Sequence, residues 1–315
     1  MHKIGIFPAS GALATSIINH LLKLVPASQL ILIARHPAKL EHLSRAGATI
    51  RHADYDDPTT LAGAFDGVHT LMLVSYASIE VEYRFEAHKA AITAARNSAV
   101  RHIFYSSLAF GGNLEPTSVA SVMGAHLLTE EYLSSTLNTQ DQTTSPTTYT
   151  AIREGLYSES LPVYTAWFDV AKPVSEITIP HSGSGPGIAW AKTDELGEAT
   201  AKMIVSYVGD PDGFRWVNNV VLFSGPKAVS LRETVEILSR VTGRDVRIKE
   251  VSADVYAELP FKEKYWYRGV NLLKDYTSCW EAFRRGETAV VSPLLGEILG
   301  REPEDFETTV RGLLS

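Results

Sequence analysis

The chain has 315 residues, of which 45% are hydrophobic and 21% are charged, as in ordinary globular proteins. Its formal net charge of −7 argues against a broad phosphate-binding surface, so we expect no nucleic-acid partner. The single cysteine excludes an internal disulfide and a cysteine-based metal site, and no apolar run is long enough to span a bilayer. We therefore expect a cytoplasmic protein without a membrane contact.

The first half of the chain alternates apolar strands with helices. Short runs rich in branched residues predict strands at 2–7, 29–34, 48–53, 69–75 and 101–107. Helical spacing and helix-start signals predict helices at 15–24, 37–47, 58–67 and 81–96. This alternation is typical of an α/β protein with a doubly wound parallel sheet and helices on both faces. Ligands of such sheets bind beyond the carboxyl ends of the strands.

The next segment continues the pattern with a longer helix. Residues 117–137 predict a helix that has Glu130 and Glu131 on its polar side. The polar run at 138–147 predicts a loop, and a sixth strand is expected at 148–157.

The rest of the second half is less regular. Ser230 and Glu233 form a capping box at the start of another helix, and a strand is expected at 245–251. We therefore expect a dinucleotide-binding domain over residues 1–158. A smaller substrate-side lobe is expected mainly over residues 159–315, and the two are expected to interleave.

The turn after the first strand has the small residues that a dinucleotide site needs. At such a site the backbone N–H groups of a helix N-terminus face the pyrophosphate, and larger side chains would collide with the ligand. The sequence departs from the glycine fingerprint, since Pro8 stands in place of its first glycine. The residues expected to hold the pyrophosphate are Ser10, Gly11, Ala12 and Leu13. The alternative is a strand-to-helix turn that holds no ligand.

The residues after the second, third and fourth strands bear on the choice of cofactor. An NAD enzyme usually has a carboxylate after the second strand, where this chain has Arg35, followed by Lys39. These cations favour the 2′-phosphate of NADP(H), although Arg35 could also be a solvated residue at a strand end. Asp54 could accept a hydrogen bond from the adenine amine or simply begin an acidic helix cap. Ser75 and Tyr76 are expected to complete the cofactor site.

Several strings of the sequence resemble the NmrA-like family of atypical short-chain dehydrogenases/reductases and its quinone-oxidoreductase relatives. They are FPASGALA, ARHPAKL, RHIFYSSL, HLLTEEYL, YTAIREGLYSES and IAWAKTDELGEATAKMI, and their order and spacing hold from Lys3 to about Val251. The resemblance implies a Rossmann-type domain with a smaller C-terminal α/β lobe, a cleft between them, and NADP(H) as the cofactor. It implies either a reductase or a protein that senses the cofactor and regulates a partner protein.

The usual catalytic pair of short-chain dehydrogenases is missing from its place. No lysine occurs between Lys89 and Lys172, so a Tyr-x-x-x-Lys pair cannot protonate the substrate there. Direct hydride transfer to a quinone is compatible with this absence, because the product is a stabilised hydroquinone anion. The hydrogen-bond donors that could serve such a substrate are Tyr76, Ser107, His126 and Tyr157.

We expect two of these donors, Tyr157 and His126, to face the substrate. His126 could instead pair with Glu130 one turn further along its helix, and Tyr157 could be an aromatic wall beside the ligand. The sequence thus predicts an NADPH-dependent oxidoreductase that reduces a small quinone-like or carbonyl molecule. The alternatives are a non-catalytic NADP(H) sensor that binds a partner protein, and a lyase or isomerase on the same fold. No metal site is expected.

Overall fold

The computed structural model describes residues 2–137, 147–260, 263, 266–267, 270–271 and 273–314. Its main feature is a parallel seven-stranded sheet in the order β3-β2-β1-β4-β5-β6-β8. The strands are β1 (Ile4–Phe7), β2 (Leu30–Ala34), β3 (Thr49–His52), β4 (Thr70–Leu73), β5 (His102–Leu108), β6 (Thr148–Glu154) and β8 (Asn219–Phe223). The strand order reverses between β1 and β4, which is where doubly wound sheets bind their ligands. The predicted sheet is therefore confirmed.

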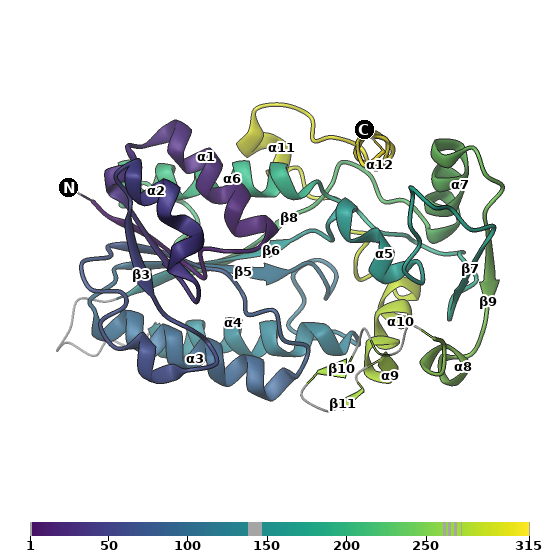
Figure 1. Cartoon of the computed structure of the whole chain (residues 1–315), viewed down its shortest axis with the longest axis horizontal. Helices are drawn as coiled ribbons and strands as arrows, with labels where there is room; N and C mark the ends of the chain where they lie inside the picture. Colours follow the sequence, from purple (N-terminus) through teal and green to yellow (C-terminus); the bar gives the residue numbers. More distant parts are fainter. Residues whose placement is uncertain are drawn as a thin grey trace.

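Helices cover both faces of this sheet (Figure 1). One face carries α1 (Ala12–Leu24), α6 (Thr193–Gly209) and α11 (Leu294–Leu299), and the other carries α3 (Val81–Asn97) and α4 (Gly124–Leu137). α1 and α6 pack so closely that a Cβ atom on Gly197 would collide with Ser16. Buried branched side chains such as Ile17 and Ile204 fill the space between these helices and the sheet. We call this unit the sheet lobe.

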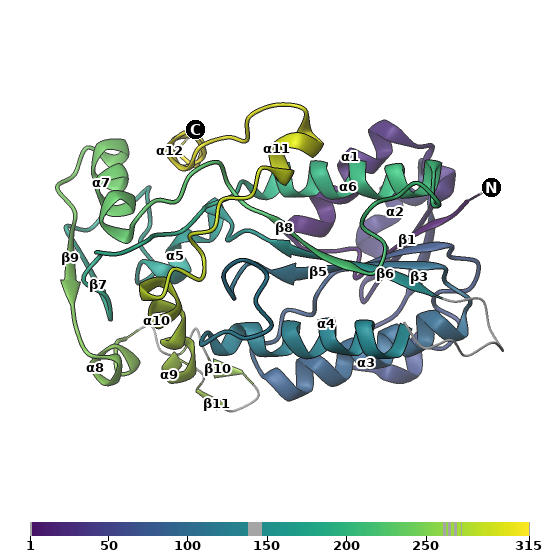
Figure 2. The same cartoon turned by 180° about the vertical axis from the view of Figure 1, so that it is seen from behind.

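A smaller second lobe lies beyond the carboxyl ends of the strands, toward which the arrow of β5 points in Figures 1 and 2. Its elements are α5 (Leu161–Tyr164), β7 (Glu176–Ile179), α7 (Leu231–Thr242), β9 (Arg247–Glu250), α8 (Ala253–Ala257), β10 (Trp266–Tyr267), β11 (Val270–Asn271), α9 (Leu273–Tyr276), α10 (Ser278–Arg284) and α12 (Phe306–Gly312). β7 and β9 pair in parallel, and a separate aromatic core surrounds Trp190 and Trp280. The predicted capping box of α7 is present, with Ser230 and Glu233 hydrogen-bonded reciprocally.

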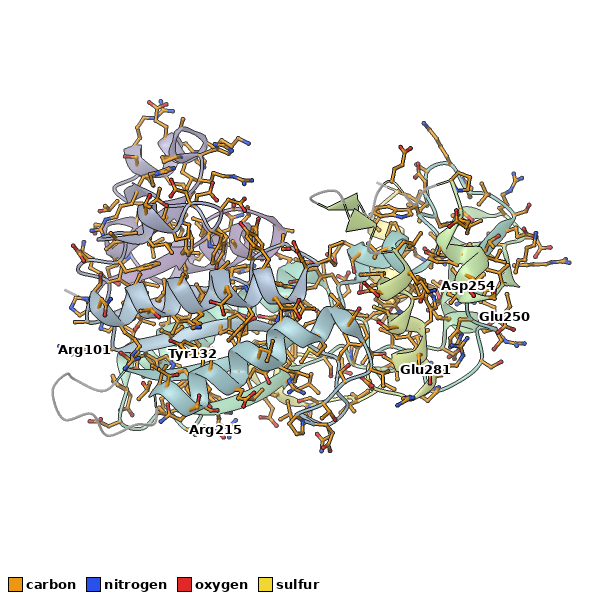
Figure 3. The ribbon with its side chains drawn as sticks, turned by 90° about the horizontal axis from the view of Figure 1, so that it is seen from below. Arg101, Tyr132, Arg215, Glu250, Asp254 and Glu281 are labelled. Carbon is orange, nitrogen blue, oxygen red and sulfur yellow. The ribbon has the colours of Figure 1, made fainter. Side chains whose placement is uncertain are left out.

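The chain passes between the two lobes more than once. α6, β8 and α11 come from the second half of the sequence but belong to the sheet lobe, where α11 packs against α6 and β8. Neither α6 nor β8 was predicted from the sequence. Figure 3 shows the two lobes from below, with Tyr132 and Arg215 on the sheet lobe and Glu250, Asp254 and Glu281 on the second lobe.

Turn chemistry shifts the boundaries of the first two predicted helices. α1 begins at Ala12 rather than Thr15, directly after the glycine turn. The helix expected at 37–47 is divided into a 3-10 turn, Pro37–Leu40, and the short helix α2 (Glu41–Arg45). Further 3-10 turns are Ala27–Gln29, Ser121–Met123 and Ser158–Ser160.

The helix expected at 58–67 is wrong, because only a 3-10 turn, Pro58–Leu61, forms there. The Asp57 carboxylate accepts a hydrogen bond from the backbone N–H of Thr59, as expected of a cap. The backbone then turns away, and Gly63 adopts a φ of 71°. A glycine in this left-handed conformation typically ends helical backbone.

The prediction that Glu130 lies on the polar side of its helix is also wrong. α4 begins at Gly124, later than the predicted 117–137, and turns Glu130 toward the sheet. There its carboxylate forms an ion pair with Arg153 of β6, at 2.8 Å between Nη2 and Oε2. The pairing residue lies 23 positions away, beyond the reach of a helical pattern.

The loop predicted at 138–147 lies outside the described residues, except for Thr147. In the described ranges, no helix is both long enough and apolar enough to cross a membrane. The same ranges contain no cluster of three or more His, Cys, Asp or Glu side chains suited to a metal ion.

Candidate functional site

Two neighbouring pockets open at the carboxyl ends of the strands. The strand-end pocket, of about 300 Å³, is lined by Phe7, Pro8, residues 10–14, Arg35, residues 53–55, residues 74–77 and Tyr157. The outer pocket, of about 460 Å³, is lined by residues 9–11, Thr15, Ile18, Asn19, residues 34–36, Lys39, Leu40, His42 and Leu43. Ser10, Gly11 and Arg35 line both, so a long ligand can run from one pocket into the other across the turn.

The turn between β1 and α1 has the form of an anion site. Gly11 adopts a φ of 88°, and a Cβ atom built on it would have no neighbour within 4 Å. Glycine is therefore required by the backbone conformation, while the space beside it is open. No side chain caps α1, so its first N–H groups remain available at the positive end of the helix dipole. The N–H of Ala9 donates to Ile33 O at 2.7 Å and ties the turn to β2.

Basic side chains gather on the outer side of the turn. The side chain of Arg35 is 55% exposed and lies 3.3 Å from Asp56 and 3.9 Å from Asp54, measured between nitrogen and oxygen atoms. Exposed ion pairs of this kind contribute little free energy, so an incoming phosphate can compete for the guanidinium. Lys39 lines the outer pocket beside His36. A dianionic phosphate in this pocket would meet Arg35 and Lys39 together.

Asp56 lies beside Arg35 and binds two tyrosines, of which Tyr76 lines the strand-end pocket. Its carboxylate accepts hydrogen bonds from Tyr76 Oη at 2.8 Å and from Tyr83 Oη at 2.6 Å. Asp54 also lines the pocket, and one of its oxygens accepts a bond from the N–H of Asp56. Asp54 thus takes part in the acidic cap and faces the pocket, so the two roles weighed from the sequence do not exclude each other.

Behind Ser75 lies a network of buried polar side chains that the sequence analysis did not identify. His88 of α3 accepts a hydrogen bond at Nε2 from the N–H of Tyr76, at 2.9 Å. Its Nδ1 therefore carries the proton and donates it to Thr129 Oγ1 at 2.9 Å. Burial and then the charge of Arg84 lower the pKa of His88 well below its ordinary value, so the imidazole is neutral.

Arg84 contacts the same serine from one turn earlier on α3. Its Nε and Nη2 donate to Ser75 Oγ at 3.1 and 2.7 Å. The Arg84–His88 spacing of four residues places both side chains on one helix face, which is the signal that could have indicated the pair. The backbone N–H of Ser75 also donates to Ser106 Oγ, which fixes the end of β4 against β5.

His126 lies deeper than the two pockets. His126 is only 3% exposed, and its Nδ1 lies 3.0 Å from Tyr105 Oη. Burial, followed by the charges of Arg84, His88 and Arg153, lowers its pKa well below the ordinary value. The alternative pairing of His126 with Glu130 is not formed, because that carboxylate binds Arg153 and accepts a hydrogen bond from Ser107.

Tyr157 lines the strand-end pocket from the end of β6. Burial raises the pKa of its phenol, so the group is neutral near pH 7. The backbone approaches closely here, since a Cβ atom on Gly155 would lie 2.9 Å from Ala191 Cβ and 3.0 Å from Phe223 O. The absence of a side chain at Gly155 thus permits the close packing that places Tyr157 in the pocket.

The structure therefore gathers most of the predicted site residues. The strand-end pocket contains Ser10, Gly11, Ala12, Leu13, Arg35, Asp54, Ser75, Tyr76 and Tyr157. Lys39 lies in the outer pocket, and His126 lies in the buried layer between α4 and β5.

Known proteins resemble this chain over most of its length. The NmrA-like family model matches residues 1–268. An NmrA-like family domain-containing oxidoreductase of Aspergillus flavus is 31% identical over 308 residues, covering 97% of this chain and 93% of the relative. Quinone oxidoreductase 2 of Escherichia coli is 32% identical over 257 residues, covering 81% of this chain and 80% of the relative.

Solved structures with bound cofactor show the same similarity. An NADPH-dependent quinone oxidoreductase from Escherichia coli, complexed with NADPH, has a TM-score of 0.78 at 27% identity, over 99% of this chain and 100% of the other. A Citrobacter sp. triphenylmethane reductase complexed with NADP(H) has a TM-score of 0.74 at 26% identity, with the same coverage of 99% and 100%.

Proposed function

The chain belongs to the NmrA-like family, as its motifs predicted, and from this premise we propose that it is an NADPH-dependent oxidoreductase. We further propose that it reduces a small quinone-like substrate by direct hydride transfer. The observation that carries the proposal is the continuous pair of pockets across the uncapped start of α1, with a cationic outer end and an aromatic inner end. Its relatives, named oxidoreductases that include a quinone oxidoreductase, support the same activity.

The residues present fit NADP(H) at each part of the cofactor. The N–H groups of residues 10–13 would bind the pyrophosphate at the helix N-terminus. Arg35 and Lys39 would hold the 2′-phosphate, because a guanidinium binds phosphate oxygens in a bidentate manner. Asp54 would accept from the adenine amine, while Ser75 and Tyr76 would border the nicotinamide end.

Hydride transfer requires the protein mainly to orient the substrate. NADPH supplies the hydride when bound. Tyr157 would orient the substrate as a neutral hydrogen-bond donor, since its raised pKa keeps the phenolic proton in place. His126 would not touch the substrate; it would hold Tyr105 in position through the 3.0 Å contact between its Nδ1 and Tyr105 Oη. The proton that completes the product can come from water, which removes the need for a Tyr-x-x-x-Lys pair.

Calorimetric titrations with NADPH, NADP⁺ and NADH, followed by a quinone and aldehyde panel at the nicotinamide absorbance, test the proposal. We expect preferential binding of NADPH and its oxidation by at least one quinone. Binding without turnover of any panel member would favour a cofactor sensor that acts on a partner protein. Turnover that persists without nicotinamide would favour a lyase or isomerase. If none of the three cofactors binds, the turn between β1 and α1 holds no dinucleotide.

A further inference from the structure

Arg84 is a partly buried residue whose guanidinium lies beside Ser75, next to the strand-end pocket. It donates two N–H groups to Ser75 Oγ, and Ser75 itself lines the pocket. Burial lowers the pKa of Arg84, and the phenols of Tyr105 and Tyr55, followed by those of Tyr157 and Tyr276, act against that lowering. Ser75 and Tyr157 both line the pocket, so Arg84 lies directly behind Ser75 at the proposed nicotinamide end.

This cation has no matching anion in the described part of the chain. Two neighbouring carboxylates pair with other cations, Glu130 with Arg153 and Asp56 with Arg35. Arg84 forms no such pair, and three of its five N–H groups have no acceptor among the described residues. Desolvation lowers its pKa, while burial, followed by the charge of Arg84, lowers the pKa of His88. A partly buried cation of this kind stabilises negative charge brought to it.

We propose that Arg84 is a catalytic residue that binds the substrate oxygen on which negative charge develops, and that the substrate is a neutral quinone. The inference rests on the proposed oxidoreductase function. A quinone accepts one hydrogen and two electrons as hydride from NADPH, which leaves as NADP⁺. One ring oxygen then holds the negative charge until water donates a proton and the hydroquinone is released. Arg84 would stabilise that oxygen during the transfer.

The positive charge of Arg84 also discriminates between the two substrate classes of the solved relatives, quinones and triphenylmethane dyes. A neutral quinone gains an oxyanion beside Arg84, so the interaction strengthens toward the transition state. A cationic triphenylmethane dye places a like charge beside the guanidinium and loses that charge on reduction. This geometry therefore favours quinones over cationic dyes.

The test measures wild type, Arg84→Met and Arg84→Lys with a neutral benzoquinone and with malachite green, alongside NADPH affinity. Loss of one oxyanion partner predicts that Arg84→Met lowers kcat for the quinone by about 100-fold. Its activity on the dye should rise by at least about fivefold, as a like charge is removed. Arg84→Lys keeps the charge without the planar fork and should retain about a tenth of wild-type kcat. NADPH affinity should change by less than about twofold.

Arg96→Met is the matched control, because it makes the same substitution near the other end of α3. It should leave both substrates unaffected. If the wild type oxidises NADPH with a quinone but Arg84→Met keeps its kcat, the role of Arg84 is refuted while the proposed function stands. A higher KM at unchanged kcat, or loss of NADPH affinity, would also refute it. A wild type that reduces no quinone would instead refute the proposed function.

Discussion

The paired pockets have an outer end and an inner end that are built in different ways. The outer end consists of a short stretch of backbone at residues 8–14 and exposed cations, among them Arg35 and Lys39. The inner end consists of side chains from β4, α3, β5 and α4 that hydrogen-bond one another in a buried layer, such as Tyr105 with His126. Backbone amides can hold any phosphate, whereas an interlocked side-chain layer fixes particular positions. We therefore expect the outer end to govern cofactor affinity, and the inner end to govern stability and turnover.

The largest effect is expected where the inner layer is broken at its ion pair. Glu130→Ala leaves the guanidinium of Arg153, whose side chain is 2% exposed, without a counter-charge. Removing one partner of a buried pair costs about 3–5 kcal/mol of unfolding free energy. Urea denaturation measures the loss. Glu131→Ala on the exposed side of the same helix should stay within about 0.5 kcal/mol of wild type. Equal losses in the two variants would show that Glu130 is not part of a stabilising layer.

The second prediction for the inner end concerns Glu154, whose carboxyl should make the free energy of unfolding depend on pH. Its carboxyl is fully buried, Oε1 accepts a hydrogen bond from Thr200, and Oε2 has no partner in the described structure. Burial raises its pKa to about 8 from 4.5. Between these values the folded chain holds a proton that the unfolded chain has lost. Its contribution to stability is therefore complete below pH 4.5 and declines as pH rises to about 8.

Glu154→Gln removes this titration. At pH 9 the variant should be more stable than wild type by about 4 kcal/mol, because wild type must bury a carboxylate there. Near pH 4.5 the two proteins should unfold at similar denaturant concentrations. Parallel stability curves for the two proteins from pH 4.5 to 9 would contradict the raised pKa.

At the outer end, the prediction concerns affinity instead of stability. Arg35→Asp should weaken NADPH binding by about 2 kcal/mol and leave NADH nearly unchanged, because only NADPH carries the 2′-phosphate. Titration calorimetry gives both affinities. Arg45→Asp on α2 makes the same change in charge outside both pockets and should leave NADPH affinity nearly unchanged. Equal weakening of NADPH and NADH by Arg35→Asp would remove Arg35 from the 2′-phosphate site.

The same contrast explains what could be predicted from the sequence. The outer end is local in the chain, so the small-residue turn and Arg35 after β2 were recognised from their order and spacing. The inner end depends on contacts across the fold, such as Glu130 with Arg153, and helical periodicity assigned that glutamate to solvent. Arg84 and His88 were missed for the same reason, since their partner Ser75 lies on another element.

The sheet shows a similar limit. Strands β1 to β6 follow one another as apolar runs between helices, and their parallel pairing follows from that alternation. β8 was missed because the chain first builds part of the second lobe and then returns to pair with β6. Neither hydrophobic periodicity nor turn signals record such a return.

Tyr157 lies where the two ends meet, and it has the smallest expected effect. Tyr157→Phe removes one neutral hydrogen-bond donor while keeping the ring in the pocket wall. Turnover with a quinone should fall by about tenfold, which corresponds to roughly 1.4 kcal/mol, and NADPH affinity should hold. Tyr132→Phe, on α4 and outside the residues that line the strand-end pocket, is the matched control and should change neither quantity. Steady-state rates with NADPH titrations separate the outcomes. Unchanged turnover would make Tyr157 part of the wall, and a fall in affinity alone would assign its phenol to the cofactor.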